Sequence, residues 1–198
     1  MANQLILASA SARRKQLLMQ LGVDFKVISA DIDESVNLNE CAEDYVCRLA
    51  AQKCQVVFEQ LCVKDRENGM AVLGSDTCVV IDDKILGKPI NQQDSLQMLQ
   101  MLSAKWHQVF TAVSIISQQK QTTILVVCDV EFVALDNAMC QAYWQSNEPQ
   151  DKAGSYAIQG KGARFVRQIK GSYSAVVGLP MAETAELLTE FDVPFWQY

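Results

Sequence analysis

The chain of 198 residues is long enough for one well-buried domain, since domains commonly span about 100 to 200 residues. Hydrophobic residues make up 49% of it and charged residues 20%, which excludes a mainly disordered chain. The net charge of -6 argues against a surface built for nucleic acid, because such surfaces need clustered lysine and arginine.

Apolar runs alternate with segments of helical period, which is typical of α/β proteins. Strands are expected at Gln4–Ala8, Phe25–Ile28, Val72–Ile81, His107–Ile116, Thr122–Leu135 and Arg164–Ile169, with a short hairpin over Ile81–Ile85. Helices are expected at Ala12–Leu21, Ala42–Leu61, Gln92–Leu102, Asn137–Trp144 and Met181–Phe191. Because strands arrive both singly and as hairpins, we predict a mixed central sheet flanked by helices. No repeat or linker marks a boundary, so we expect a single domain over residues 1–198.

The seven cysteines are odd in number, show no CxxC spacing and lie mostly in apolar patterns. They predict buried, reduced thiols in a cytoplasmic protein, without a zinc site. The first residues lack a basic stretch before a long apolar core, and no run of about 18 apolar residues occurs, so we expect neither a signal peptide nor a membrane span.

His107 is the only histidine, which excludes a metal cage of several histidines, and we expect it to be structural. Neither GxxxxGK[ST] nor GxGxxG occurs, so the usual signatures of P-loop kinases and Rossmann dinucleotide enzymes are lacking.

The stretch LILASASARRKQLL places three cations at the start of a predicted helix. Ser11 is a suitable N-cap, and Arg13, Arg14 and Lys15 follow in the first turn. Cations there cost roughly 0.3 to 1 kcal/mol each, because the helix dipole is positive at this end. A bound anion would reverse that sign, since backbone NH groups, serine hydroxyls and guanidinium groups together form a phosphate site. The alternative is a run of solvated surface charges, and the local sequence leaves both open.

Two further charges stand in apolar surroundings. Lys53 lies inside the apolar stripe of helix 42–61, where it either extends past the edge or reaches a carboxylate or phosphate. Asp76 interrupts the run AVLGSDTCVVI, which is costly unless its carboxylate is paired, hydrogen-bonded or bound to a metal. The alternative is that Asp76 is a strand-end or bulge residue beside Gly74. The segment DIDES (residues 31–35) is a solvated acidic loop, or it supplies further oxygen ligands for Mg²⁺ or Mn²⁺.

Two loops have the composition of ligand-binding segments. DKAGSYAIQGKGARF (residues 151–165) carries small residues, an amide and charges, and GKP (residues 87–89) is a weaker signal of the same kind. Each is a place of close backbone approach to a ligand or an ordinary connector. Phosphate-binding cations combined with hard-metal carboxylates indicate phosphoryl chemistry with water or another acceptor.

Four segments in this order resemble the Maf family of nucleoside triphosphate pyrophosphatases. They are LILASASARRKQLLMQLGVDF, VLGSDTCVVIDDKILGKP, DKAGSYAIQGKGARFV and GSYSAVVGLP, so the resemblance covers nearly the whole chain. It implies an α/β fold with a mixed central sheet and two lobes around a cleft, similar to the house-cleaning inosine triphosphatases. It also implies hydrolysis between the α and β phosphates of a nucleotide, giving the monophosphate and pyrophosphate with a divalent metal, Mg²⁺ or Mn²⁺.

The resemblance assigns roles to individual residues. Asp76 matches the family's proposed catalytic acid/base, and the polar cleft residues match Glu34, Lys53 and Lys88. We expect Glu34 and Asp76 to hold the metal. The phosphate-binding start matches Ser9, Ser11, Arg13 and Arg14, and the positions linked to base choice match Arg13, Thr77 and Gln159. Ala10 and Ala12 replace the family's usual glycine and proline, and neither change removes a charged group.

The loop form DKAGSYAIQG resembles the branch that acts on dTTP and UTP, and the implied role is house-cleaning with a link to cell-division arrest. One alternative is a pyrophosphatase for modified purine nucleotides such as 7-methyl-GTP. Another is a nucleotide-binding regulatory protein with little catalysis. We expect a nucleoside triphosphate as substrate and neither nucleic acid nor membrane as partner. The oligomeric state stays open, with a homodimer as one option.

Overall fold

The computed structural model describes residues 4–196 and divides them into two compact units. The first unit comprises residues 4–76, 111–126 and 178–196, and the second comprises residues 77–110 and 127–177. Three strands contribute residues to both units: β3 (Ala71–Ile81), β5 (Trp106–Ile116) and β6 (Gln121–Phe132). The expectation of a single domain stays a prediction.

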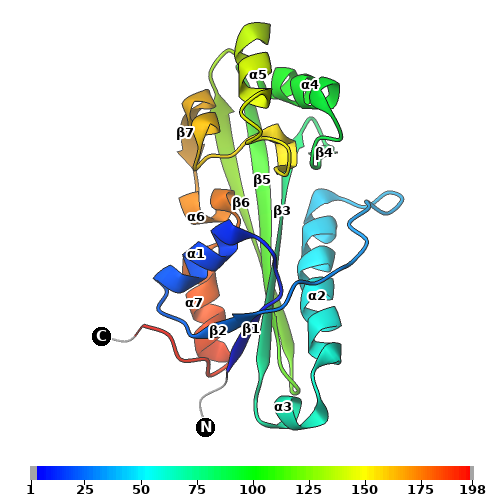
Figure 1. Cartoon of the computed structure of the whole chain (residues 1–198), viewed down its shortest axis with the longest axis vertical. Helices are drawn as coiled ribbons and strands as arrows, with labels where there is room; N and C mark the ends of the chain where they lie inside the picture. The colour runs from blue at the N-terminus through cyan, green and yellow to red at the C-terminus, as the bar shows by residue number, and fades with distance from the viewer. Residues whose placement is uncertain (1–3, 197–198) are drawn as a thin grey trace. The chain divides into compact units, whose positions relative to one another are not determined.

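The first unit is built around short parallel strands. Strand β1 (Leu5–Leu7) pairs in parallel with β2 (Phe25–Val27) on one edge and with the start of β3 on the other, in the register Leu5 opposite Ala71. Strand β1 and the part of β3 that pairs with it (residues 71–73) are entirely apolar, as expected for strands that are buried on both faces. The helices of this unit are α1 (Ala12–Gln20), α2 (Ala42–Gln60), α3 (Val63–Glu67) and α7 (Met181–Glu190). Figure 1 shows α2 on one side of these strands and α1 and α7 on the other.

An apolar cluster joins α2 to the strands of the first unit. It contains Cys54, Val57 and Phe58 of α2 together with Ile6 of β1 and Val72 of β3. These helix residues recur at the spacing of one helical face, so burying that face fixes both the position and the rotation of α2. The directions in which the other side chains of α2 point are fixed as a result.

The second unit contains a β-hairpin and a set of short helices. Strand β4 (Lys84–Leu86) pairs antiparallel with the end of β3, and β7 (Val166–Lys170) pairs antiparallel with β6. Its helices are α4 (Gln92–Leu102), α5 (Asn137–Trp144) and α6 (Tyr173–Val177), with 3₁₀ turns η1 (Ala153–Ser155) and η2 (Lys161–Phe165). In the turn of the hairpin, Asp82 and Asp83 adopt positive φ angles, which aspartate tolerates better than most residues.

Within residues 4–196 the strands form a seven-stranded mixed sheet in the order β2-β1-β3-β5-β6-β7, with β4 on β3. The predicted α/β class and mixed sheet are therefore confirmed. The strand predicted to reach Leu135 ends at Phe132, and the strand predicted from Arg164 begins at Val166, because η2 occupies residues 161–165. Helices α3 and α6 were not predicted, since five residues are too few to show a helical period.

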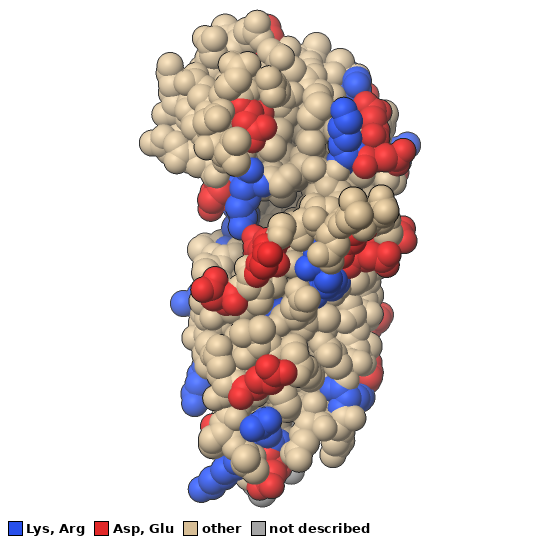
Figure 2. Space-filling model, turned by 90° about the vertical axis from the view of Figure 1, so that its right-hand side faces the viewer, with Lys and Arg blue, Asp and Glu red and all other residues tan. Residues whose placement is uncertain are grey.

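The seven cysteines are free thiols; four of them are buried, whereas Cys41 and Cys62 are exposed. Among residues 4–196, no helix combines the length and the apolar character that crossing a membrane requires. On the face drawn in Figure 2, basic side chains are interspersed with acidic ones.

His107 is buried in the second unit near the start of β5, as expected for a structural histidine. Its Nε2 lies 2.9 Å from the hydroxyl of Tyr156, and its ring meets that of Phe132 edge-on at 4.8 Å between centroids. Burial lowers the pKa of His107 from 6.5 to about 4. Because the folded-state pKa lies below the unfolded value, the unfolded chain binds the proton more tightly, and stability declines as the pH falls from 6.5 towards 4.

We predict that His107→Gln flattens the acid side of the stability profile. Between pH 7 and pH 5, the free energy of unfolding of the wild type should fall by about 2 kcal/mol more than that of the variant, because glutamine takes up no proton. Urea denaturation of both proteins at the two pH values measures this difference, and other titrating groups cancel in the comparison. Equal losses in the two proteins would show that His107 is not protonated on unfolding.

Candidate active site

Two carboxylates from separate segments meet at one lysine in the first unit. Lys53 Nζ lies 2.6 Å from Asp76 Oδ1 and 2.7 Å from Glu34 Oε1. The side chains of Lys53 and Asp76 are only 9% and 10% exposed, whereas that of Glu34 is 39% exposed. The lysine therefore reaches carboxylates rather than extending past the edge of its helix. Through it, the acidic segment after β2 is tied to Asp76.

The backbone around Asp76 explains how α2 comes so close. Asp76 lies in the interior of β3, not at a strand end, and Gly74 precedes it on the same face of the strand. A Cβ at position 74 would lie 2.7 Å from the carbonyl oxygen of Ala50 and 2.9 Å from Cys54 Sγ, so only glycine fits beside α2 there. Because Lys53 stands next to Cys54 on the helix, this close approach brings its ammonium to the Asp76 carboxylate.

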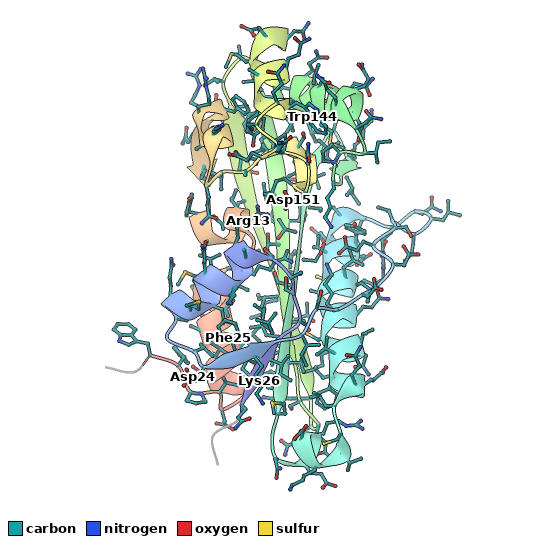
Figure 3. All side chains as sticks on the ribbon, in the orientation of Figure 1. Arg13, Asp24, Phe25, Lys26, Trp144 and Asp151 are labelled. Atoms are coloured by element: carbon teal, nitrogen blue, oxygen red, sulfur yellow. The ribbon has the colours of Figure 1, made fainter. Side chains whose placement is uncertain are left out.

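The start of α1 forms a polar cluster beside these residues. The Ser11 side chain caps the helix by accepting a hydrogen bond from the Arg14 amide at 3.4 Å. Ser9 Oγ accepts from the Ser11 amide at 3.2 Å and from Arg14 Nη1 at 3.5 Å. Figure 3 places Arg13 at this end of α1. The predicted N-cap is therefore confirmed, and hydroxyls and guanidinium groups gather where backbone NH groups of α1 point outward.

Arg14 is anchored and lies within electrostatic range of both carboxylates. Its Nε donates to the carbonyl oxygen of Gly178 at 2.8 Å. Burial lowers the pKa of Arg14, the carboxylates of Asp76 and Glu34 oppose that effect, and the neighbouring Arg13 adds to it. An arginine stays protonated under such a shift, because its unperturbed pKa lies far above neutrality. The cluster thus holds three cations, Arg13, Arg14 and Lys53, against two carboxylates, which favours a polyanionic ligand.

The carboxylate pair fits a divalent metal of the hard, oxygen-binding kind. Glu34 and Asp76 converge on one cation in the structure, and the same oxygens suit Mg²⁺ or Mn²⁺. Within the described part of the chain, no three His, Cys, Asp or Glu side chains form a metal-binding group. The donor set therefore matches the mode in which one or two carboxylates share Mg²⁺ with water and substrate phosphates.

Three of the predicted residues belong to the second unit. Thr77 follows Asp76 directly on β3. Lys88 and Gln159 are exposed on two loops that lie together, because the Gly154 amide donates to the Gly87 carbonyl at 3.0 Å. Their participation with the carboxylates stays a prediction.

Two residues of the site were missed from the sequence. Ser75 is fully buried and donates from Oγ to the carbonyl oxygen of Gly178 at 3.0 Å. The same carbonyl oxygen therefore accepts hydrogen bonds from both Ser75 and Arg14. Tyr45 donates its hydroxyl to the carbonyl oxygen of Glu34 at 2.9 Å. A serine within a buried strand was a visible signal next to Asp76, whereas Tyr45 fits the apolar stripe of α2 and gave none.

Comparison with known proteins finds relatives that span nearly the whole chain. A family model described as Maf-like protein matches residues 4–191. The dTTP/UTP pyrophosphatase of Pseudoalteromonas atlantica is 54% identical over 189 residues, which are 96% of this chain and 97% of that protein. The dTTP/UTP pyrophosphatases of Vibrio parahaemolyticus and Hahella chejuensis are 51% and 45% identical, over 94% and 98% of this chain and 96% and 94% of their own lengths.

We predict that Lys53→Met lowers the free energy of unfolding at pH 7 by about 3 to 5 kcal/mol, because it leaves the buried Asp76 carboxylate without its cation. Adding Asp76→Asn to this variant should restore part of the loss, since the unpaired charge is then removed. The control is Lys105→Met, whose half-exposed lysine lies 3.4 Å from Asp82 and should change stability by about 1 kcal/mol or less. Chemical denaturation measures all three, and a Lys53→Met effect as small as the control's would contradict a buried ion pair.

Proposed function

The chain belongs to the Maf family, and we propose that it is a pyrophosphatase that hydrolyses dTTP and UTP to the nucleoside monophosphate and pyrophosphate. The observation that carries this proposal is the convergence of Glu34 and Asp76 on Lys53 beside the cationic start of α1. The names of the relatives, which cover nearly all of this chain at 45% to 54% identity, support the choice of substrates. A protein that only binds nucleotides gains little from a buried aspartate of this kind, because desolvating it is costly.

In the proposed reaction, a water molecule attacks the α phosphorus of the nucleotide. A new bond forms from the water oxygen to that phosphorus, and the bond to the oxygen that bridges the α and β phosphates breaks. Asp76 accepts the proton that the water loses, and the bridging oxygen leaves with pyrophosphate. The buried position of Asp76 on a paired strand fixes the acceptor oxygen, which proton transfer in a transition state requires.

We propose that the cations of the site stabilise the negative charge that develops on the phosphates during the reaction. Arg14 is held by Gly178 and Ser9, and a guanidinium fixed in this way can bind phosphate oxygens without being ordered first. Lys53 is set between the two carboxylates, and we propose that Arg13 and Lys88 contact the phosphates as well. A divalent metal held by Glu34, Asp76 and the substrate would lower the pKa of water and neutralise charge on the leaving pyrophosphate. The first turn of α1 then carries cations because its ligand is a triphosphate.

The compartment that we propose is the cytoplasm, where thiols stay reduced. All seven cysteines are free in the structure, and two of them are exposed. This agrees with a reducing environment that also contains the proposed substrates.

We predict that the purified chain releases pyrophosphate from dTTP and UTP faster than from CTP or 7-methyl-GTP when Mg²⁺ or Mn²⁺ is present. Asp76→Asn should lower kcat by about 100- to 10,000-fold, because it removes the proton acceptor while keeping the size of the side chain. Asp83→Asn is the matched control, since the same change falls in an exposed turn at a φ of 60° that asparagine accepts.

Pyrophosphate release is measured with a coupled phosphate assay for each nucleotide. Near-normal activity in Asp76→Asn would refute the role of Asp76. Binding of nucleotides without pyrophosphate release would favour a regulatory protein, and a clear preference for 7-methyl-GTP would favour the purine branch.

A further inference from the structure

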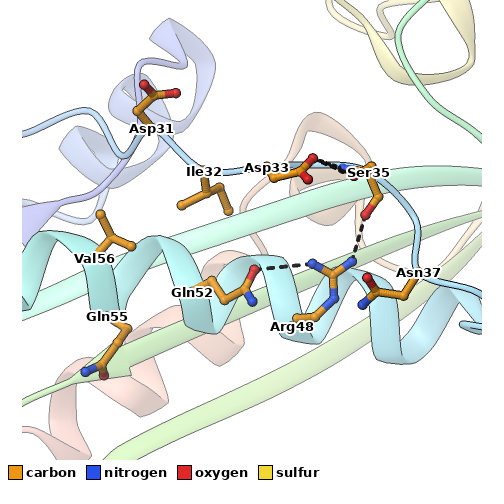
Figure 4. Close-up of a pocket in the computed structure, with 9 residues that line it drawn as sticks. All are labelled: Asp31, Ile32, Asp33, Ser35, Asn37, Arg48, Gln52, Gln55 and Val56. Carbon is orange, nitrogen blue, oxygen red and sulfur yellow. Dashed lines mark hydrogen bonds between the residues drawn. The ribbon is translucent and has the colours of Figure 1, made fainter.

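The segment that carries Glu34 has little hydrophobic anchoring. Residues 31–40 form neither helix nor strand, and the side chains of Val36 and Leu38 are 48% and 93% exposed. Between this segment and α2 lies a cavity of about 500 Å³ (Figure 4). Seven of the nine residues that line it have polar side chains: the lining consists of Asp31, Ile32, Asp33, Ser35, Asn37, Arg48, Gln52, Gln55 and Val56. Polar contacts, rather than burial of apolar surface, must therefore hold the segment against the helix.

Arg48 of α2 provides the largest share of these contacts. Its Nε lies 2.5 Å from Glu40 Oε1 and its Nη2 lies 2.7 Å from Glu40 Oε2, so the guanidinium holds both carboxylate oxygens. The same Nη2 donates to the carbonyl oxygen of Ser35 at 3.0 Å, and Nη1 donates to Gln52 at 3.2 Å (Figure 4). Glu40 in turn accepts a hydrogen bond from the amide of Asn37 at 2.9 Å. One side chain thus fastens the segment at Ser35 and at Glu40.

The pairing of Arg48 with Glu40 has the geometry in which an ion pair near the surface is effective. Two parallel N–H···O bonds match the fork of a guanidinium to a carboxylate, and the Glu40 side chain is only 8% exposed. The hydrogen bond from Arg48 lowers the pKa of Glu40 to about 2, so the carboxylate stays ionised throughout the neutral range.

These contacts lie next to Glu34 in the sequence. Ser35, whose carbonyl Arg48 holds, follows Glu34 directly, and the Tyr45 hydroxyl holds the carbonyl of Glu34 itself. Tyr45, Arg48 and Gln52 recur at the spacing of one helical face, and Lys53 lies beside that face. The face that holds the backbone of the segment is therefore in fixed relation to the lysine that the Glu34 carboxylate must reach.

We propose that Arg48 and Glu40 are positioning residues: they hold residues 34–40 on α2 so that the Glu34 carboxylate reaches Lys53. The proposal rests on the proposed function, in which Glu34 holds the metal together with Asp76 and the substrate. Neither Arg48 nor Glu40 touches the reacting atoms. Without them, the segment loses the contacts of Arg48 with Ser35 and Glu40, and the partly exposed Glu34 carboxylate then spends more time in water.

We predict that Arg48→Met and Glu40→Gln each lower kcat by about 10- to 100-fold with a smaller change in KM, because displacing a catalytic group by about 1 Å costs this much. Arg48→Lys keeps the charge but loses the fork, so it should recover only part of the activity. The matched controls are Lys120→Met and Glu190→Gln, which break a surface pair of 2.8 Å in the same unit and should keep wild-type kcat. Thermal melting shows that each variant is folded.

A double-mutant cycle tests whether Arg48 acts through Glu34. In a Glu34→Gln background, Arg48→Met should lower kcat by less than about twofold, since there is no carboxylate left to position. A further loss as large as in the wild-type background would overturn the proposal. A wild-type kcat in both Arg48→Met and Glu40→Gln would overturn it as well.

Hydrogen–deuterium exchange gives a readout that does not depend on activity. Peptides covering residues 33–40 should exchange at least about tenfold faster in Arg48→Met than in the wild type and the Lys120→Met control, because the segment opens more often. Unchanged exchange would overturn the proposal that Arg48 holds this segment on α2. If the wild type releases no pyrophosphate, the proposed function fails and the positioning role fails with it, while the exchange rates still show whether Arg48 holds the segment.

Discussion

The arrangement of the first unit depends on the ion pairs that the buried ammonium of Lys53 makes with two carboxylates. A lysine in this position loses its hydration and is stable only with anionic partners in good geometry. Its two partners come from different places, Asp76 from the interior of β3 and Glu34 from the segment before α2. The charges are satisfied only when helix, strand and segment are all in place. Forming the site is therefore part of forming the fold in this region.

Two helices of the first unit carry opposite charges in their first turns. Helix α2 begins with Glu43 and Asp44, which suit the positive end of a helix dipole. Helix α1 has no acidic residue in its first turn and carries Arg13 and Arg14 there instead. The chain compensates for Arg14 internally, with the Gly178 carbonyl and the nearby carboxylates. An internal compensation of this kind preserves a cationic surface for a ligand, whereas an acidic first turn would have cancelled it.

The sequence predicted most where many residues repeat one pattern. The bounds of α4 and α5 were predicted to the residue because their apolar period extends over two or more turns, whereas the five-residue helices α3 and α6 have no readable period. The sequence also showed that Lys53 needs a partner, but not which one, since pairing across the chain is a property of the fold. Arg48 gave no signal, because an arginine on a helix face is the usual pattern of a solvated side chain. The roles of Lys88 and Gln159 rest on the family resemblance alone.

The two carboxylates differ in how firmly the chain holds them, and this difference bears on the roles that we propose for them. Asp76 is buried in the interior of β3 beside the close packing of α2 against Gly74, so its carboxylate cannot move far without disturbing the core. Glu34 lies on a segment that forms neither helix nor strand and that polar contacts hold beside a cavity, so its position depends on those contacts. A proton acceptor must be rigid because proton transfer depends on short, aligned distances. In the reaction that we propose, Asp76 is this acceptor, and the placement of Glu34 for the metal depends instead on the contacts that Tyr45 and Arg48 make with its segment.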